Sequence, residues 1–302
     1  MAYTAADLTA DELTRLTANK PIISSKNKGY PFTSAEWNGT GLVGTNINDA
    51  AYPTSRSVDG HLPLITRPAS VQPTAMFLVF RFPSPGIDFD FVVISKHNAL
   101  SLGTDPNVLV FIADDGNFSV NALTVASFSP VTTSKRLVNV KLQDNGAGTF
   151  RRYTGVEYAR VKFSWLGGGS FKPELGEVFF GRRRQLPRNP DVPWNDKRET
   201  SRVSDFETRS GLRTRFVFNK GRAERSAFMP LDSDADIAMM DSWWDDTEEG
   251  TEPFFWIENP NTTPSAYLMR NEEAAYNFPL VGPYERDFQV NMLEQATFVS
   301  QE

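Results

Sequence analysis

Cysteine is absent from the 302 residues of this sequence. Without cysteine the chain can form no disulfide, no thiolate zinc site and no iron–sulfur cluster, and it has no thiol nucleophile. A chain that needs no disulfide is suited to folding in a reducing cytosol, and that is where we expect it to be made.

Histidine is nearly as scarce, with only His61 and His97. A Ser-His-Asp arrangement would have to recruit one of them, yet no serine lies in a Gly-x-Ser-x-Gly motif. We expect His61 to be a turn residue, and His97 to make local hydrogen bonds at the end of a strand. Gly167-Gly168-Gly169 lacks the Lys-Ser/Thr of a phosphate-binding loop. The sequence therefore predicts no catalytic residue, no cofactor and no enzyme.

Long apolar runs are missing as well. No stretch approaches the roughly 20 apolar residues that cross a bilayer. The first residues have neither the basic region nor the apolar core of a signal peptide. A net charge of -6 lacks the excess of Lys and Arg that neutralises phosphates. We therefore expect a soluble protein that neither inserts into membranes nor binds nucleic acid.

The sequence is rich in aromatic residues, at 12%, and in turn formers, with 20 Gly and 20 Pro. Short apolar runs bounded by turn residues predict strands at 76–82, 89–94, 108–112, 136–142, 149–153, 156–163 and 175–180. Asp115-Gly116 after the third run is a hairpin signal, because Asp-Gly tolerates positive φ. This spacing predicts an all-β chain that begins with a β-sandwich of the jelly-roll or discoidin-like type.

Three prolines within residues 186–194 stiffen the chain and block strand pairing, so we place a domain boundary there. The predicted organisation is an N-terminal arm at 1–20, the sandwich at 21–185, a linker at 186–195 and a smaller C-terminal β domain at 196–302. Further strands are expected at 212–218, 253–257, 266–270 and 286–293.

Two helices are predicted from their capping residues. Thr9 and Glu12 have the spacing of a capping box at the start of a short helix in the arm. Ser233 can cap a helix that runs to Trp244, the one substantial helix of the C-terminal domain. The aromatic pairs Trp243-Trp244 and 254–256 are expected in the core rather than as a platform for stacking sugars.

Charge is distributed unevenly along the chain. Residues 197–225 hold nine basic and four acidic residues, whereas residues 232–258 hold ten acidic residues and no basic one. Such blocks are either solvated faces or complementary surfaces of neighbouring subunits. We therefore single out candidate subunit-interface residues, which are Arg182, Arg183, Arg184, Asp245, Asp246, Glu248 and Glu249.

Each charged cluster has a plainer interpretation that the sequence leaves open. The three arginines, which follow a buried-looking strand, are equally typical of an exposed sheet edge that resists aggregation. The acidic cluster at 245–249 lacks the ligand spacing and fixed glycine of an EF-hand, which favours a solvated loop over a calcium site. Whether the sandwich loops bind calcium or sugar stays open.

A family resemblance rests on two parts of the sequence. Residues 158–163 and 173–182, with Gly176-Glu177-Val178-Phe179-Phe180-Gly181, resemble the closing strands of the discoidin-like jelly roll in tail proteins of tailed bacteriophages. Residues 253–256 and 288–298 look like the terminal β domain of distal tail or baseplate-hub proteins. The resemblance covers roughly residues 75–298.

This resemblance implies a structural virion protein that forms a homo-oligomeric ring and connects the tail tube to the tip proteins. Its expected partners are copies of itself and other tail proteins, and its expected place is the virion tail after assembly in the host cytoplasm. An alternative is a carbohydrate-binding or receptor-binding tail module whose partner is a cell-surface glycan. A third is a glycan depolymerase, whose paired carboxylates cannot be found from sequence alone because their separation is spatial.

Overall fold

The structure is a computed structural model. It describes the whole chain except residues 1, 30–33, 40–45, 61–63, 129–135, 143–149, 168, 191–196, 199–202, 208–212, 218–222, 261–264, 272–285 and 295–302. Strands dominate the described residues, and two α-helices accompany them. The predicted β-rich fold, a sandwich followed by a smaller β unit with one helix, is confirmed.

The sandwich has a broad outer sheet of five strands, in the order β3 (Ser34–Asn38), β4 (Ala75–Arg81), β11 (Tyr158–Leu166), β7 (Thr104–Ala113) and β8 (Leu123–Phe128). Facing it are two three-stranded sheets, β12 (Glu177–Gly181), β6 (Phe91–Ser95) and β9 (Arg136–Asn139), and β1 (Thr4–Asp7), β10 (Arg151–Val156) and β5 (Ile87–Phe89). Short 3-10 helices, η1 (Thr54–Ser57) and η2 (Ala99–Ser101), lie in the connections.

Alternation along β11 shows why these strands form a sandwich. Ala159, Val161, Phe163 and Trp165 are buried, while their neighbours are partly exposed, as expected for a strand with one face on a core. The predicted hairpin is confirmed, because the segment with Asp115-Gly116 joins β7 to its antiparallel neighbour β8, but the positive φ angles of this connection lie at Phe118 and Asn121 and not at Gly116.

The strand predicted at 89–94 is divided by Asp90. Phe89 ends β5 and Phe91 begins β6, and these two strands belong to different sheets. The Asp90 backbone N–H donates to the carbonyl of Gly181 at 2.9 Å, and its carboxylate accepts from the Arg183 N–H at 2.8 Å. The chain therefore passes from one sheet to the other at Asp90, whose carboxylate accepts a hydrogen bond from a backbone N–H.

The second unit is a seven-stranded sheet covered by a helix. Its order is β13 (Arg183–Gln185), β2 (Ile22–Ser24), β18 (Phe254–Glu258), β19 (Ser265–Asn271), β20 (Arg286–Glu294), β17 (Ala223–Leu231) and β14 (Lys197–Arg198). Helix α2 (Asp234–Asp246) packs on one face, where Met240 and Trp243 meet Phe254, Trp256 and other buried side chains of the sheet. The predicted N-cap Ser233 and the predicted burial of Trp243 and of the aromatics on β18 are confirmed, whereas Trp244, also predicted in the core, is only partly buried.

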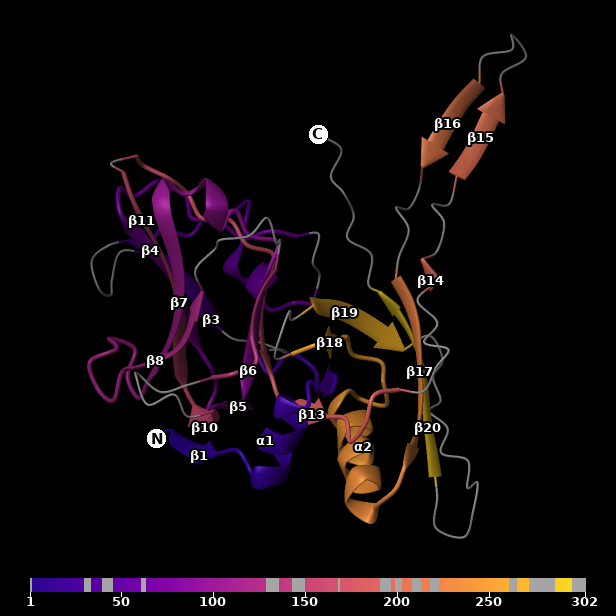
Figure 1. Ribbon diagram of the computed structural model, residues 1–302. Coiled ribbons are helices and arrows are strands. Elements are labelled where there is room, and N and C mark those ends of the chain that lie inside the picture. The colour runs from indigo at the N-terminus through magenta and orange to yellow at the C-terminus, as the bar shows by residue number, and fades with distance from the viewer. Residues whose placement is uncertain are drawn as a thin grey trace.

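The two units share a core. Phe91 on β6 and Phe179 on β12 face away from the sandwich interior and pack against Phe255 and Ile257 on β18. The rings of Phe179 and Phe255 are edge to face, with centroids 4.8 Å apart. Figure 1 shows the resulting layers, with the sandwich at the left, β18 and β19 beside it and α2 below them. Strands β6, β12 and β18 are therefore buried on both faces.

Strands from the two ends of the predicted sandwich domain enter the second sheet. β2 pairs with both β13 and β18, so residues 22–24 and 183–185 extend the seven-stranded sheet. Leu186, at the start of the predicted linker, is buried, and residues 191–196 lie outside the described part of the chain. The boundaries drawn at 21, 186 and 196 remain predictions, but hydrogen bonding ties β2 and β13 to the second unit.

The N-terminal residues pack on the rest of the chain. β1 pairs with β10, and helix α1 (Ala10–Thr17) inserts Leu16 into the shared core. The predicted capping box is confirmed, because the Glu12 N–H donates to the Thr9 hydroxyl and the Thr9 N–H donates to the Glu12 carboxylate.

One element stands apart from both units. Strands β15 (Val203–Glu207) and β16 (Arg213–Val217) pair only with each other among the described strands. In Figure 1 this hairpin projects far beyond β14 and β17.

Among the described residues, no helix is long and apolar enough to cross a membrane.

Candidate functional site

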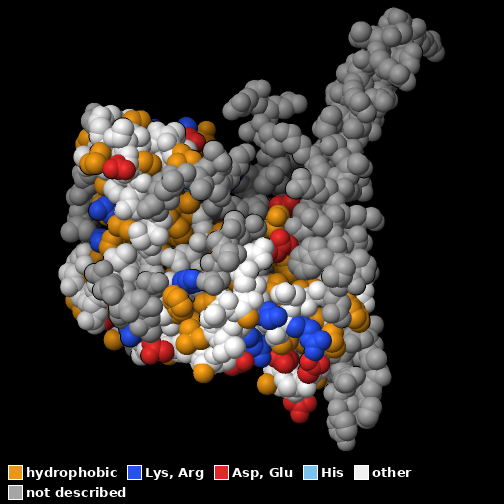
Figure 2. Space-filling model, viewed as in Figure 1, with side chains coloured by type: hydrophobic (Ala, Val, Ile, Leu, Met, Phe, Trp, Pro, Cys, Tyr) orange, Lys and Arg blue, Asp and Glu red, His pale blue; other side chains and the backbone are white. Residues whose placement is uncertain are grey.

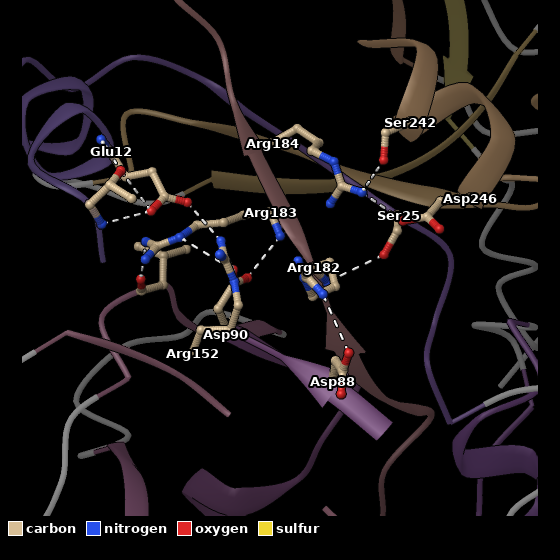
Figure 3. A network of polar contacts seen from close by, with 12 residues as sticks. Glu12, Ser25, Asp88, Asp90, Arg152, Arg182, Arg183, Arg184, Ser242 and Asp246 are labelled. Atoms are coloured by element: carbon tan, nitrogen blue, oxygen red, sulfur yellow. Dashed lines mark hydrogen bonds and ion pairs between the residues drawn. The ribbon is translucent and has the colours of Figure 1, made fainter. Parts of the chain in front are cut away.

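The arginine run of the sequence lies at the junction of the two units, where β12 leads into β13. Because side chains alternate along an extended chain, the three guanidiniums cannot all face one surface. Figure 3 shows Arg183 directed toward Asp90 and Arg152, whereas Arg182 and Arg184 are directed toward Asp88 and Asp246. The run therefore divides into a buried part and a part that reaches a cleft.

Arg183 belongs to a buried network. Its side chain is 2% exposed, and its Nη1 donates to the Val140 carbonyl at 2.9 Å. Asp90, which is 0% exposed, accepts from the Arg152 Nε at 3.0 Å and lies 3.8 Å from the Arg183 Nε. Arg152 continues to Glu12 of α1, with its Nη2 2.7 Å from the carboxylate. The network links the helix of the arm, the sandwich and β13.

Burial and neighbouring charges of opposite sign shift the pKa values of these groups in opposite directions. Burial lowers the pKa of Arg183, and the attraction of Asp90 only partly offsets this. Burial raises the pKa of Glu12, but hydrogen bonds from Thr9 and the charge of Arg152 outweigh it, so the net pKa is lowered. The charged form of Glu12 is thus stabilised by its partners.

An open cleft of about 720 Å³, which we call the junction cleft, lies where the sandwich meets α2. Its charged and hydroxyl lining includes Lys28, Asp88, Arg182, Arg184, Ser242 and Asp246. The Arg184 Nη2 donates to Asp246 at 2.7 Å and to the Ser242 hydroxyl at 2.9 Å. Arg182 Nη1 lies 3.5 Å from the Asp88 carboxylate. Charged groups of both signs therefore meet in one solvent-filled space.

The rest of the junction cleft is lined by both apolar and hydroxyl-bearing residues, which are Ala2, Thr4, Pro85, Gly86, Ile87, Thr154 and Gly155. The hydroxyls of Thr4 and Thr154 contact each other across β1 and β10. Gly86 has a φ of 87°, and a Cβ there would come within 2.6 Å of the Gly155 backbone carbon. Only glycine fits at this position, so backbone rather than side chains forms this part of the cleft.

The predicted acidic candidates lie at the end of α2 and just beyond it. Asp246 pairs with Arg184 and lies 3.5 Å from the Lys28 Nζ, and Glu248 pairs with Lys26. Asp245 and Glu249 are exposed. Figure 2 shows acidic and basic side chains interspersed over this part of the surface.

The structure therefore joins two candidates that the sequence could not pair, Arg184 and Asp246, within one chain. Whether Arg182, Arg184 or the exposed acidic residues also contact a neighbouring subunit stays a prediction. Arg183 is enclosed by its own chain and presents no surface to such a neighbour.

The other residues singled out from the sequence have structural roles or lie outside the described residues. The Nδ1 of His97 accepts a hydrogen bond from the Ala99 N–H at 3.2 Å, which confirms the local bonding expected after a strand. His61 lies outside the described residues. Within the described ranges, no group of three His, Cys, Asp or Glu side chains is arranged to hold a metal ion.

Glu177 is a buried carboxyl group that sequence reasoning treated only as part of a strand motif. It accepts from the Asn27 amide at 2.8 Å and from the Gly60 N–H at 3.0 Å. Burial, and then the nearby Asp59, raise the pKa of Glu177 well above its usual value. Its bonds fix the segment after β2 and the loop after η1 to β12, so we assign it a structural role.

Sequence reasoning missed Lys28, Asp88 and Ser242 as residues of the site. They lie on three separate segments, and nothing in their neighbourhoods marks them as functional. Asp88 is held in place locally because its carboxylate accepts from the Gly155 N–H at 3.0 Å. Only the folded chain brings these residues together.

No family model and no curated protein matches the chain. Among solved structures, a GH29 fucosidase of Ruminococcus gnavus matches at 12% identity and a TM-score of 0.37, over 55% of this chain and 28% of the fucosidase. A family 32 carbohydrate-binding module from NanJ of Clostridium perfringens, solved with galactose, matches at 10% identity and a TM-score of 0.31, over 53% of this chain and 99% of the module. A structure of two such modules of ZmpB from the same organism matches at 17% identity and a TM-score of 0.34, over 60% of this chain and 41% of the ZmpB chain. We draw no function from likenesses of this size.

Proposed function

We propose that this chain is a non-enzymatic binding protein whose junction cleft recognises a carbohydrate. The observation that carries the proposal is the lining of the cleft, in which Asp88 and Asp246 supply acceptors and Lys28, Arg182 and Arg184 supply donors. Each sugar hydroxyl both donates and accepts hydrogen bonds, and a few convergent polar groups in a cleft of this size are typical of a small-ligand site.

Binding without catalysis fits the chemistry of the cleft. A glycosidase generally needs a carboxylic acid that protonates the leaving group and a second carboxylate beside it. Here Asp246 accepts from Arg184, and Asp88 accepts from the Gly155 N–H and faces Arg182. Both carboxylates are therefore engaged as acceptors, which suits them to hold hydroxyls in place.

The proposal is tested by Asp88→Asn. A hydrogen bond to a charged group contributes about 1.5–3 kcal/mol, so we expect the variant to bind its sugar at least about tenfold more weakly. The measurement is a glycan array screen of the full chain, followed by titration calorimetry on the best ligand. Asp7→Asn is the matched control, because Asp7 is exposed on β1 outside the cleft lining. An array without any bound glycan, or equal losses in the two variants, would contradict the proposal.

A second candidate function is structural, and the β15–β16 hairpin favours it. An isolated two-stranded hairpin is at best marginally stable in water, so a projecting one is well suited to complete its packing on another molecule. As a tail-tip component of a tailed bacteriophage, the chain would assemble in the host cytoplasm, contact copies of itself and other tail proteins, and act in the virion.

The structural candidate predicts rings of the purified chain in negative-stain electron microscopy. Replacing residues 201–219 with a short Gly-Ser linker should abolish those rings and leave the melting temperature of the subunit nearly unchanged. A native chain that stays monomeric at high concentration would count against this candidate without affecting carbohydrate binding.

A further inference from the structure

We propose that the junction cleft binds the anionic groups of an acidic polysaccharide through Lys28, Arg182 and Arg184. This inference rests on the proposed function, carbohydrate binding in the same cleft, and specifies the ligand. The shared chemistry is an oxyanion on a polyhydroxylated chain, either the carboxylate of a sugar acid or the phosphate of a polyol phosphate.

The first argument is the balance of charge in the cleft. Three cationic side chains line it, but only two carboxylates, those of Asp88 and Asp246, are there to pair with them. Asp246 lies 2.7 Å from Arg184 and 3.5 Å from Lys28, so one carboxylate is shared by two cations. The lining thus has one positive charge in excess, which an anionic ligand would neutralise.

The second argument is donor capacity that the chain does not use. A guanidinium carries five N–H donors and an ammonium three. The side chain of Arg182 is 27% exposed, and its Nη1 contact with the Asp88 carboxylate is long at 3.5 Å. A carboxylate or phosphate entering the cleft could accept from Arg182 and Lys28 together.

The third argument is electrostatic. Burial lowers the pKa of Lys28, and repulsion by Arg184 and Arg182 lowers it further, while the charge of Asp246 opposes both. Burial likewise lowers the pKa of Arg184, with Arg182 contributing in the same direction. A bound anion would reduce the repulsion between these neighbouring cations and so stabilise their charged forms. Charge-assisted hydrogen bonds are also about twice as strong as neutral ones.

The walls of the cleft suit the uncharged part of such a ligand. Thr4, Thr154 and Ser242 present hydroxyl groups, and the backbone at Gly86 and Gly155 allows close approach of a sugar ring. An acidic sugar polymer would use both kinds of surface, its anion against the cations and its hydroxyls along these walls.

The test compares three trimers by titration calorimetry on the full chain, namely trigalacturonate, its uncharged galactose counterpart and a glycerol phosphate trimer. We expect a charged trimer to bind at least about tenfold more tightly than the uncharged one, a difference of about 1.4 kcal/mol. The preference should shrink as salt is raised, because partly exposed charges are screened. The two charged trimers distinguish a carboxylate from a phosphate ligand.

Lys28→Gln, with Lys162→Gln as the matched control, assigns the preference to the cleft. Lys162 is a partly exposed cation on β11, outside the lining of the cleft. We expect Lys28→Gln to weaken the charged trimer about tenfold more than the uncharged one, and Lys162→Gln to change neither. Should Lys28→Gln fail to fold, the salt dependence of the native chain still decides.

Two outcomes separate this inference from the function on which it rests. Equal affinity for charged and uncharged trimers, or equal effects of the two lysine variants, overturns the preference for acidic ligands and leaves carbohydrate binding in place. Failure of every trimer and every arrayed glycan to bind overturns the proposed function itself.

Discussion

Asp90→Ala is expected to lower the free energy of unfolding by about 3–5 kcal/mol, because it leaves a buried cation without its partner. Asp90 is 0% exposed, and its carboxylate accepts from the Arg183 N–H at 2.8 Å and from the Arg152 Nε at 3.0 Å. Removal of the carboxylate leaves the Arg183 side chain, which is 2% exposed, without this ion pair. The measurement is urea denaturation of the purified chain at neutral pH.

Asp7→Ala is the matched control for this prediction. Asp7 accepts from the Arg151 Nε at 3.0 Å, but its side chain is 67% exposed. Exposed ion pairs contribute about 0–1 kcal/mol, so the control should change the unfolding free energy by no more than that. A loss for Asp90→Ala as small as that of the control would show that water reaches Arg183.

The cost of breaking the network is not its net contribution to stability. Burial lowers the pKa of Arg183 even beside Asp90, which means that desolvation of the guanidinium outweighs the attraction. A double variant, Asp90→Ala with Arg183→Met, should therefore recover part of the loss of the single variant. The value of the network lies in fixing how the arm, the sandwich and β13 meet.

The elements that sequence reasoning predicted well are those whose cause is local. The capping box of Thr9 and Glu12 needs a spacing of three residues, and the alternation of β11 needs a strand with one buried face. Trp243 and the aromatic residues on β18 are buried as predicted, because large rings gain most from leaving water, whereas Trp244 is only partly buried.

The junction cleft could not be predicted, because its parts meet only through long-range packing. Arg182 and Asp88 are 94 residues apart, and Arg184 and Asp246 are 62 apart. The arginine run was considered as one charged unit, whereas strand alternation sends its middle member into the interior. The entry of β2 and β13 into the second sheet likewise depends on partners distant in sequence.

The shared core leads to the last prediction, which concerns Phe255→Ala. Removing a buried phenylalanine costs about 3–5 kcal/mol, since both transfer energy and packing are lost. Phe255 is 0% exposed on β18, and its ring meets that of Phe179 on β12 with centroids 4.8 Å apart. The loss should therefore fall on the sandwich and the seven-stranded sheet together.

The variant is measured by differential scanning calorimetry, with Phe228→Ala on β17 as control because Phe228 is 40% exposed. We expect Phe255→Ala to move a single transition to lower temperature and the control to shift it far less. Two transitions in the variant, with the upper one at the native temperature, would show instead that the sandwich folds without the seven-stranded sheet. A single transition is expected because strands β6, β12 and β18 are buried on both faces. If one unit unfolded alone, large apolar side chains of the other would be exposed to water.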